Sequence, residues 1–424
     1  MERPTTVRAG DSDVELFAAR AVDLANLVRE RRLSPVDVVR VHLDRIAAVE
    51  GRIRAFQVVL ADDALAEAEA LATHPDLDRL PLAGVPVAVK DNVDVRGAPS
   101  RLGSQATSDI TAAADDELVA RLRRAGCVII GKTQMPELAV WPFTEPSAFS
   151  ATRNPWDASR TPGGSTGGGA AAVASGMAAL ALGSDGGGSI RVPASCCGLV
   201  GLKPGRGVVP LAGGASQHWY GLTEFGPLAR SVADVAAALD VLAGTSGYAN
   251  VQPPDRPLRI AYSPRHFGVG VRVAPALRAA VEETAETLAA AGHTLVEARP
   301  PYPANLGLRF SRRWLAGISE DAGGLPEDLL EDRTRQMARR GRRLSAQVTP
   351  AQEDDFAAKV ADWFKSFDLF LTPTLSRGPV PMGTWTGRGW VRTMLGVGNW
   401  VNTTPWNLAG LPAASIPFGS GAGL

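Results

Sequence analysis

The chain has few of the residues that usually build metal sites, disulfide frameworks or histidine-based catalytic sites. Its 424 residues include five histidines and three cysteines, and their spacing matches no metal-binding motif or secreted disulfide pattern. No histidine lies near the glycine-rich serines at positions 165 and 189. The sequence therefore predicts no metal, and Cys127, Cys196 and Cys197 are expected to be reduced residues of the core.

The sequence also lacks an excess of charge of either sign and a long apolar run. Lys and Arg total 44, as do Asp and Glu, so a general nucleic-acid or anionic-membrane surface is not expected. Residues 1–6 contain no apolar signal core, and the most apolar long stretch, residues 169–183, is too short to span a bilayer. These features predict a cytoplasmic protein with no nucleic-acid or membrane partner.

Short apolar runs alternate with helical periodicity along most of the chain. The expected strands are 85–89, 127–130, 180–182, 259–262, 294–298 and 369–371. The expected helices are 21–31, 36–49, 62–72, 116–125, 168–179, 231–242 and 274–291, with another starting near Ser189. Such alternation predicts an α/β fold, in which helices cover both faces of a twisted mixed sheet. We interpret residues 1–424 as one domain, in which the helical, Arg-rich stretch 300–366 is an insert or lid.

Two serines lie on glycine-rich turns at the ends of one stretch of small residues. Ser165 lies within Gly163–Gly169, and Ser189 follows the three glycines 186–188. Glycines before a helix start allow backbone N–H groups to converge on one point, which is what an oxyanion hole requires. Taken alone, each serine is more simply a loop residue or a helix cap.

Lys90 directly follows the apolar run 85–89, so we expect it at the end of a buried strand. Burial disfavours the ammonium form, and a neutral lysine can act as a general base. A structural ion pair is the alternative role for such a lysine. Because no histidine lies near Ser165 or Ser189, Lys90 is the candidate to activate a serine nucleophile.

Together these residues resemble the amidase signature family of Ser–Ser–Lys hydrolases. The matching stretches are 84–92, 125–136, 153–155, 163–203, 226–244, 367–374 and 407–417, with the signature core at 84–244. Ser165 precedes Ser189 by 24 residues and Lys90 precedes it by 99. These are the separations that the family pattern requires, and the signature is long enough to be specific.

The resemblance implies an amidase that hydrolyses linear C–N amide bonds of a small-molecule substrate, without metal or organic cofactor. Ser189 would be the acylated nucleophile, and Ser165, held by a cis peptide bond, would relay its proton to Lys90. The oxyanion would be bound by four backbone N–H groups, those of Gly186, Gly187, Gly188 and Ser189. Activity is then expected to rise towards alkaline pH.

Four positions depart from the usual family pattern without removing a member of the triad. Thr166 and Gly169 replace serines, Gly186 replaces Thr or Ile, and Cys196 replaces an aromatic residue. The extra glycine is expected to loosen the oxyanion loop. Family members also continue beyond the equivalent of Leu424 with a core strand and a closing helix. We expect the sequence to be truncated rather than the protein to lack an edge of its sheet, and a protein made at this length is expected to be poorly soluble.

Two alternatives to the amidase remain open at this stage. The A subunit of a tRNA-dependent amidotransferase shares the signature and releases ammonia from glutamine within a complex. Genes for the partner subunits next to the gene of this protein would identify it as such a subunit. A truncated, catalytically silent remnant is the other. The acyl group, the amine and the oligomeric state are left open. Four late tryptophans either line an apolar acyl pocket or pack on the surface of the lid, namely Trp385, Trp390, Trp400 and Trp406.

Two common motifs occur in the wrong context. Residues 126–133 match the spacing of a P-loop. Their inner residues, however, favour a strand, and a helix precedes them. A P-loop instead follows a strand and precedes a helix. Residues 163–167 match the nucleophile elbow, yet no apolar strand leads into them. Neither nucleotide binding nor an α/β-hydrolase site is therefore expected.

Overall fold

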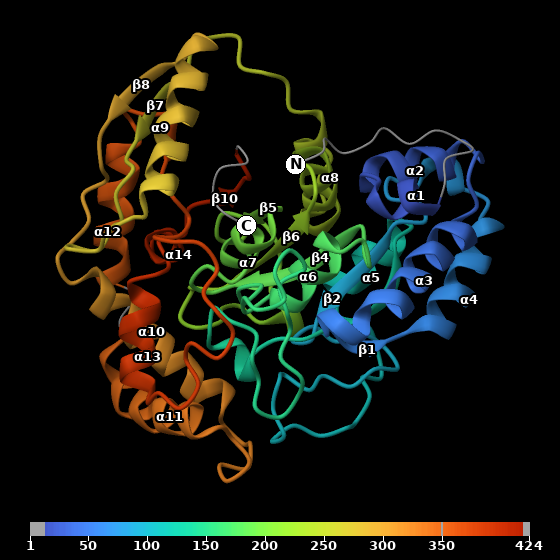
Figure 1. Ribbon diagram of the computed structural model, residues 1–424, viewed down its shortest axis with the longest axis horizontal. Helices are drawn as coiled ribbons and strands as arrows, with labels where there is room; N and C mark the ends of the chain where they lie inside the picture. The colour runs from blue at the N-terminus through green and yellow to red at the C-terminus, as the bar shows by residue number, and fades with distance from the viewer. Residues whose placement is uncertain (1–12, 349–350, 419–424) are drawn as a thin grey trace.

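A seven-stranded mixed sheet forms the centre of the computed structural model, which describes residues 13–348 and 351–418 (Figure 1). The strand order is β1-β3-β2-β4-β6-β5-β10. The β2–β3 and β2–β4 pairs are parallel and the remaining pairs are antiparallel. The strands are β1 (Phe56–Val59), β2 (Pro86–Lys90), β3 (Val128–Thr133), β4 (Leu180–Asp185), β5 (Val200–Lys203), β6 (Glu224–Ala229) and β10 (Ala413–Ser415).

The central strands are buried on both faces, which explains why they read as continuous apolar runs. Successive residues of a strand point to opposite faces. Val87 and Val89 of β2 accordingly join one hydrophobic cluster, which also contains residues of α2, α5 and α8, whereas Ala88 joins the other, which contains residues of α6 and α7. The predicted α/β fold with helices on both faces of a mixed sheet is thus confirmed.

Each predicted helix has an observed counterpart, whereas α1, α13 and α14 were not predicted. They are α1 (Asp13–Ala18), α2 (Ala21–Arg29), α3 (Pro35–Ile53), α4 (Ala61–Ala72), α5 (Glu117–Arg124), α6 (Gly167–Ala174), α7 (Arg191–Cys197), α8 (Val232–Ala243), α9 (Pro275–Ala290), α10 (Leu306–Asp321), α11 (Asp332–Leu344), α12 (Ala351–Trp363), α13 (Trp390–Gly398) and α14 (Thr404–Leu408). Helix α6 is shorter than the predicted helix 168–179. It ends before Gly176 because the φ of this residue, 78°, is incompatible with a right-handed helix.

Three of the predicted strands form a second sheet rather than extending the first. Strands β7 (Arg259–Tyr262), β8 (Thr294–Glu297) and β9 (Leu369–Leu371) pair in parallel in the order β8-β7-β9. A long connection after α8 carries the chain to this sheet, which lies beside α9 and α12 on the left of Figure 1. Local sequence patterns identify strands, but which strands pair is decided by distant parts of the chain, so one sheet was expected where two exist.

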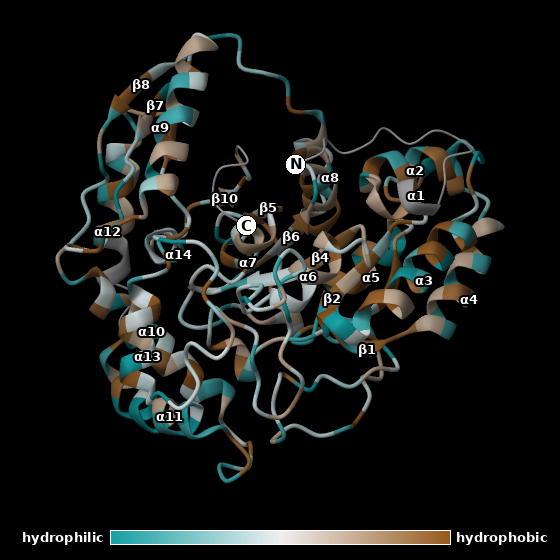
Figure 2. Cartoon of the chain, in the orientation of Figure 1, coloured by the Kyte–Doolittle hydropathy of each residue, from teal (hydrophilic) through white to brown (hydrophobic). Residues whose placement is uncertain are grey.

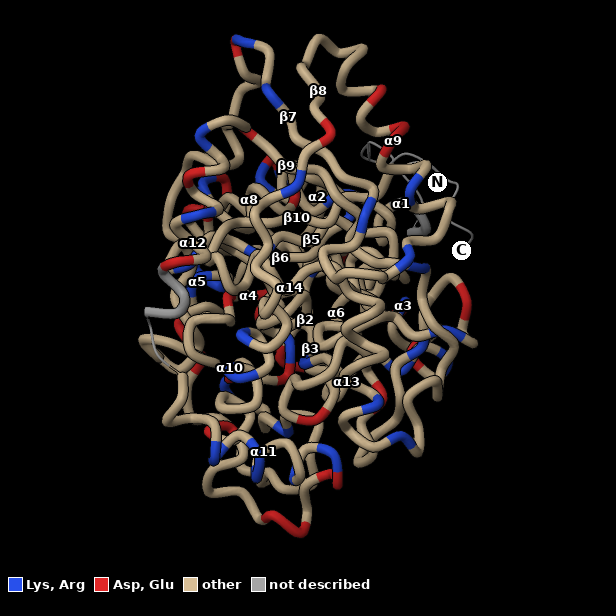
Figure 3. Tube along the Cα trace, turned by 90° about the vertical axis from the view of Figure 1, so that its left-hand side faces the viewer, with Lys and Arg blue, Asp and Glu red and all other residues tan. Residues whose placement is uncertain are grey.

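Charges of both signs are spread along the chain in the view of Figure 3, in keeping with the zero net charge. Helix α11 carries six arginines and one aspartate, and it is mostly hydrophilic in Figure 2. None of the helices in the described ranges is long and apolar enough to cross a membrane.

Helices α10 and α11 approach each other closely at Gly341. A Cβ atom at this position would overlap the carbonyl oxygen of Leu315 on α10, so a larger residue must push the two helices apart. We expect Gly341→Ala to lower the free energy of unfolding by about 1–3 kcal/mol, although alanine is the better helix former. Urea denaturation measures this loss.

Gly307 on α10 offers the matched control for this prediction. It is also a helical glycine, but no described packing neighbour lies within 4 Å of the position that a Cβ atom would take there. Gly307→Ala should therefore leave stability unchanged or raise it by up to about 1 kcal/mol. If the two substitutions changed the free energy of unfolding equally, the close approach of α10 and α11 would not contribute to stability.

Candidate active site

Lys90 lies at the carboxyl end of β2, beside the end of β4, and its side chain is fully buried. Its Nζ donates hydrogen bonds to Ser165 Oγ at 2.7 Å and to Ser184 Oγ at 2.8 Å, and it contacts the Ser184 carbonyl oxygen at 3.3 Å. Carboxyl ends of parallel strands meet at one edge of a sheet, which is where ligands of α/β proteins commonly bind. The structure thus brings Lys90 and Ser165 into direct contact.

Ser165 lies between Lys90 and the segment that carries Ser189. The Gly164–Ser165 peptide bond is cis, as the family resemblance implied. The N–H of the next residue, Thr166, donates to the Ser189 carbonyl oxygen at 3.1 Å. Ser165 is fully buried, whereas Ser189 is half-buried and keeps some contact with solvent. The more accessible of the two serines is therefore the predicted nucleophile.

Burial shifts Lys90 towards its neutral form. It lowers the pKa of Lys90 from the usual value of lysine to about 7, although the negative charge of Asp185 acts in the opposite direction. A lysine with this pKa is about half neutral at pH 7 and can then accept a proton.

Ser184 restricts how a neutral Lys90 could accept a proton. Its hydroxyl oxygen accepts hydrogen bonds from Lys90 Nζ and from Asn92 Nδ2, the latter at 3.1 Å, and these occupy both lone pairs of the hydroxyl. The Ser165 hydroxyl, at 2.7 Å, is the other hydroxyl within hydrogen-bond distance of Lys90 Nζ. Sequence reasoning assigned no role to Ser184, because a serine in a strand carries no local signal of its partners.

The glycine-rich turn after β4 is organised by Asp185. Its carboxylate accepts hydrogen bonds from the backbone N–H groups of Gly188 at 2.7 Å, Ile190 at 3.2 Å and Arg191 at 3.4 Å. The Gly188 amide, which the resemblance assigned to the oxyanion, therefore has an internal acceptor here. No described residue accepts a hydrogen bond from the other three amides of the predicted hole, those of Gly186, Gly187 and Ser189.

A buried ion pair fixes Asp185 in turn. Arg191 forms two hydrogen bonds of 2.9 Å with its carboxylate, and Asn407 of α14 adds another of 2.9 Å. Burial raises the pKa of Asp185, but the charge and hydrogen bonds of Arg191 and Asn407 outweigh burial and hold that pKa below its usual range. Asp185 therefore stays ionised and keeps its hydrogen bonds to the backbone amides of the turn.

Helix α14 also reaches the turn directly. Arg191 donates to the Thr403 carbonyl oxygen at 2.9 Å and to Asn407 Oδ1 at 2.6 Å, and Thr403 Oγ1 donates to the Gly187 carbonyl oxygen at 2.6 Å. These contacts join positions more than 200 residues apart. The stretch 407–417 was matched to the family by sequence, but no local pattern could show that it supports the turn.

The extra glycine at position 186 does not leave the turn loose, contrary to the expectation from sequence. The ring of Trp219 occupies the space, and a Cβ atom at Gly186 would lie 2.7 Å from Trp219 Cε3. The other departure next to the triad, Thr166, keeps a hydroxyl that donates to the Ser184 carbonyl oxygen at 3.3 Å.

Several residues outside the site were also singled out by sequence. Gly131 and Lys132 lie inside strand β3, so the P-loop match has no phosphate cradle, and Lys132 forms a buried ion pair with Asp91 at 3.2 Å. The three cysteines are unpaired and buried, as expected of core residues. Of the late tryptophans, Trp390 is half-buried and the rest are buried. In the described part of the chain, no group of three or more His, Cys, Asp or Glu side chains could hold a metal ion.

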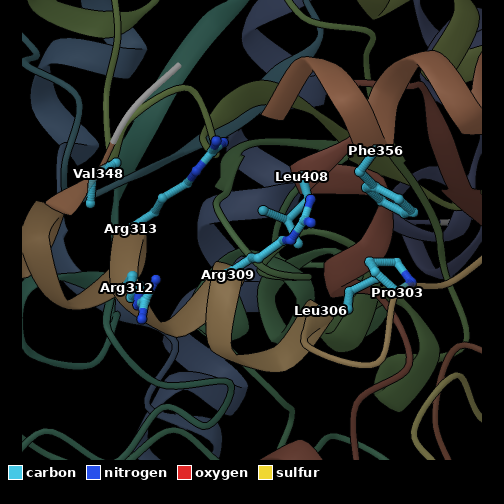
Figure 4. A pocket seen from close by; sticks show the side chains of 8 residues that line it. All are labelled: Pro303, Leu306, Arg309, Arg312, Arg313, Val348, Phe356 and Leu408. Atoms are coloured by element: carbon cyan, nitrogen blue, oxygen red, sulfur yellow. The ribbon is translucent and has the colours of Figure 1, made fainter. Parts of the chain in front are cut away.

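Figure 4 shows a pocket that lies beside α10, α12 and α14 and contains none of the predicted site residues. It is lined by Pro303, Leu306, Arg309, Arg312, Arg313, Val348, Phe356 and Leu408. Leu408 directly follows Asn407, so this pocket borders the support of the glycine turn rather than Lys90, Ser165 or Ser189.

Known proteins with similar sequences include putative amidases and an amidotransferase subunit. The chain is 43% identical to "Putative amidase AmiB2" of Mycobacterium tuberculosis over 425 residues, which cover 95% of this chain and 90% of that protein. It is 34% identical to the A subunit of the glutamyl-tRNA(Gln) amidotransferase of Moorella thermoacetica, over 97% of this chain and 92% of that protein.

A solved structure of a related hydrolase has a similar fold. The structure of 6-aminohexanoate cyclic dimer hydrolase complexed with substrate matches with a TM-score of 0.80 and 30% identity, over 95% of this chain and 90% of that one. The profile of the family described as Amidase matches residues 37–424. With the fold, the glycine turn and the relatives in agreement, the chain belongs to the amidase signature family.

Proposed function

We propose that the protein is an amidase that hydrolyses linear carboxamides through an acyl-enzyme on Ser189. The observation that carries the proposal is the buried contact of 2.7 Å between Lys90 Nζ and Ser165 Oγ, beside the segment of Ser189. It links a lysine of lowered pKa to a serine that can pass on a proton. A small-molecule amide is the proposed substrate.

The first half of the reaction transfers the acyl group to Ser189. Ser189 Oγ attacks the amide carbonyl carbon while its proton passes to Ser165 Oγ, and the Ser165 proton passes to neutral Lys90 Nζ. The carbonyl oxygen becomes an oxyanion, which the amides of Gly186, Gly187 and Ser189 can stabilise. The C–N bond then breaks as the proton on Lys90 returns through Ser165 to the leaving nitrogen.

The second half releases the acid. Water attacks the Ser189 ester and gives up a proton along the same path from Ser165 to Lys90. A second oxyanion forms at the same three amides and collapses, which returns the proton to Ser189 Oγ. The products are a carboxylate and an amine or ammonia, and the enzyme regains its starting protonation state.

Among the alternatives, the amidotransferase A subunit has one observation in its favour, the 34% identity to the Moorella thermoacetica protein. The identity of 43% to AmiB2 favours an amidase. The presence of Lys90, Ser165 and Ser189 also supports an active enzyme over a silent remnant. Glutamine hydrolysis that needs partner subunits would support the amidotransferase alternative.

Covalent labelling of Ser189 tests the proposed function. A fluorophosphonate reacts with a serine only where that serine is activated, so the intact mass should increase by one adduct on the wild type. Ser189→Ala should show no adduct, and peptide mapping should place the wild-type adduct on Ser189. Intact-mass spectrometry is the measurement.

Two controls make the labelling result decisive. Circular dichroism must show that the wild type and Ser189→Ala are both folded. Ser159→Ala removes an exposed serine that is bonded to Asp157 and lies outside the site, so it should label as the wild type does. A folded wild type that takes no adduct would overturn the proposal.

A further inference from the structure

Gly186 of the proposed oxyanion turn is contacted by two side chains from the segment that leads into β6. A Cβ atom at Gly186 would lie 2.7 Å from Trp219 Cε3 and 3.1 Å from Thr223 Oγ1. Thr223 directly precedes β6, whose first residue pairs with Asp185. A glycine can adopt many backbone conformations, so its neighbours must fix the direction of its amide. An oxyanion donor has to be fixed in this way before the reaction begins.

The two side chains are linked through one histidine and one carboxylate. His218 Nδ1 lies 2.8 Å from Thr223 Oγ1, and His218 Nε2 lies 3.1 Å from Asp321 Oδ1. The other carboxylate oxygen, Asp321 Oδ2, accepts a hydrogen bond of 2.6 Å from Trp219 Nε1. Trp219 also stacks on His218, with ring centroids 5.3 Å apart. Asp321 therefore holds both side chains that contact Gly186, Trp219 directly and Thr223 through His218.

Helix α10 brings Asp321 to this position. Asp321 is the last residue of α10, within the stretch 300–366 that was expected to be an insert or lid. Gly317 lies four residues earlier on the same face of the helix, and a Cβ atom there would overlap the Trp219 ring. Trp219 and Tyr220 have φ values of 48° and 54°, a left-handed conformation that bulky residues keep only where their surroundings impose it. Helix α10 therefore helps to fix Trp219 in place.

The hydrogen bonds of this network have a defined direction. A carboxylate only accepts and an indole N–H only donates, so both oxygens of Asp321 act as acceptors. His218 Nε2 must then carry a proton, and the Thr223 hydroxyl donates to Nδ1 when the ring is neutral. An asparagine at position 321 would reverse this order. Its carbonyl oxygen would accept from Trp219, and its amide group would donate to His218 Nε2, which must then lack a proton.

We propose that Asp321 is a positioning residue of the active site, which holds the Gly186 amide in the orientation that binds the oxyanion. It acts through Trp219, His218 and Thr223 rather than on the substrate itself. This inference rests on the proposed amidase function and adds to it a residue of α10. It also explains how glycine can replace the usual Thr or Ile at position 186, because Trp219 and Thr223 restrict the backbone in place of the missing side chain.

The rate of fluorophosphonate labelling measures the effect of Asp321 without a known substrate. Ser189 Oγ bonds to phosphorus, the P–F bond breaks with loss of fluoride, and the phosphoryl oxygen takes the place of the oxyanion. The dependence of the rate on reagent concentration gives the maximal rate constant, kinact, and the half-saturating concentration, KI. Loss of one oxyanion donor typically slows a reaction by about 10²- to 10³-fold, so a misdirected donor should cost less. We expect Asp321→Asn to lower kinact about tenfold and to leave KI within about twofold of the wild type.

The tautomer of His218 separates positioning from a merely structural role. Nitrogen-15 NMR of the histidine rings should show Nε2 protonated in the wild type and unprotonated in Asp321→Asn. The signals of His218 are identified by their loss in His218→Gln. Asp328→Asn makes the same change at an exposed acid beyond the end of α10, so it should match the wild type in labelling rate and tautomer.

Thr223 provides a second pair of variants that does not depend on Asp321. Thr223→Val keeps the shape of the side chain but removes the hydroxyl that bonds His218, so it should also lower kinact. Thr223→Ser keeps the hydroxyl and should retain most of the wild-type rate. If Asp321→Asn does not fold by circular dichroism, this pair decides the question. Equal kinact values for Thr223→Val and Thr223→Ser would contradict the inference.

Two further results would overturn the inference while the amidase proposal stands. One is a kinact of folded Asp321→Asn within about twofold of the wild type. The other is a lowered kinact with no change in the tautomer of His218. Failure of the proposed function looks different: Ser189 of the folded wild type would then take no label, and the inference would fail with it.

Discussion

Replacing Lys90 with methionine is expected to lower kcat/KM for amide hydrolysis by about 10²- to 10⁴-fold, the usual contribution of a general base. Methionine keeps the volume and the apolar stem of the side chain but cannot bind a proton. Since Lys90 contacts Ser165 Oγ at 2.7 Å, its loss leaves the Ser165 relay without an acceptor. Steady-state kinetics on the folded variant measure the loss.

The pH profile shows whether Lys90 acts as a base or only supports the fold. Because its pKa is lowered to about 7, the active neutral form should increase about tenfold per pH unit below 7 and level off above it. A lysine with the usual pKa would give a rise that continues to about pH 10. The residual activity of Lys90→Met should lack this step. A wild-type profile that falls steadily above neutrality would contradict the assignment.

Replacing Arg191 with methionine is expected to lower the free energy of unfolding by about 3–5 kcal/mol. Asp185 and Arg191 are almost completely buried, at 0% and 2% exposure, so the substitution leaves an uncompensated carboxylate in the interior. Urea denaturation followed by circular dichroism measures the change. Because Asp185 holds the amide of Gly188, we expect kcat to fall as well.

Two further variants test the reason for that loss. Arg40→Met removes the exposed partner of Asp37, where both side chains are more than half exposed, and should cost less than about 1 kcal/mol. Adding Asp185→Asn to Arg191→Met removes the buried charge and should recover part of the stability. A double variant no more stable than Arg191→Met would show that the buried charge is not the cause.

The sequence was most informative where structure is local. Strands such as 85–89 and 180–182 lie within one to three residues of their observed ends because buried parallel strands form short continuous apolar runs. The start of α3 is given by Ser34, whose hydroxyl accepts from the Val36 amide. Helix 168–179 was overextended because small residues beyond Ala174 still favour a helix, and only the positive φ at Gly176 ends it.

The candidate site likewise has features that local sequence predicts and features that depend on distant contacts. The sequence by itself determined the family and predicted Lys90, Ser165 and Ser189 as the site, because these residues lie in motifs of fixed spacing. Only the tertiary structure decided the rest: that Ser184 orients Lys90, that Asp185 engages the amide of Gly188, and that α14 supports the turn. The second sheet and the packing of Trp219 on Gly186 belong to the same group. The physical reason is that such contacts join residues far apart in the chain, and their energies depend on burial and distance, which no local pattern records.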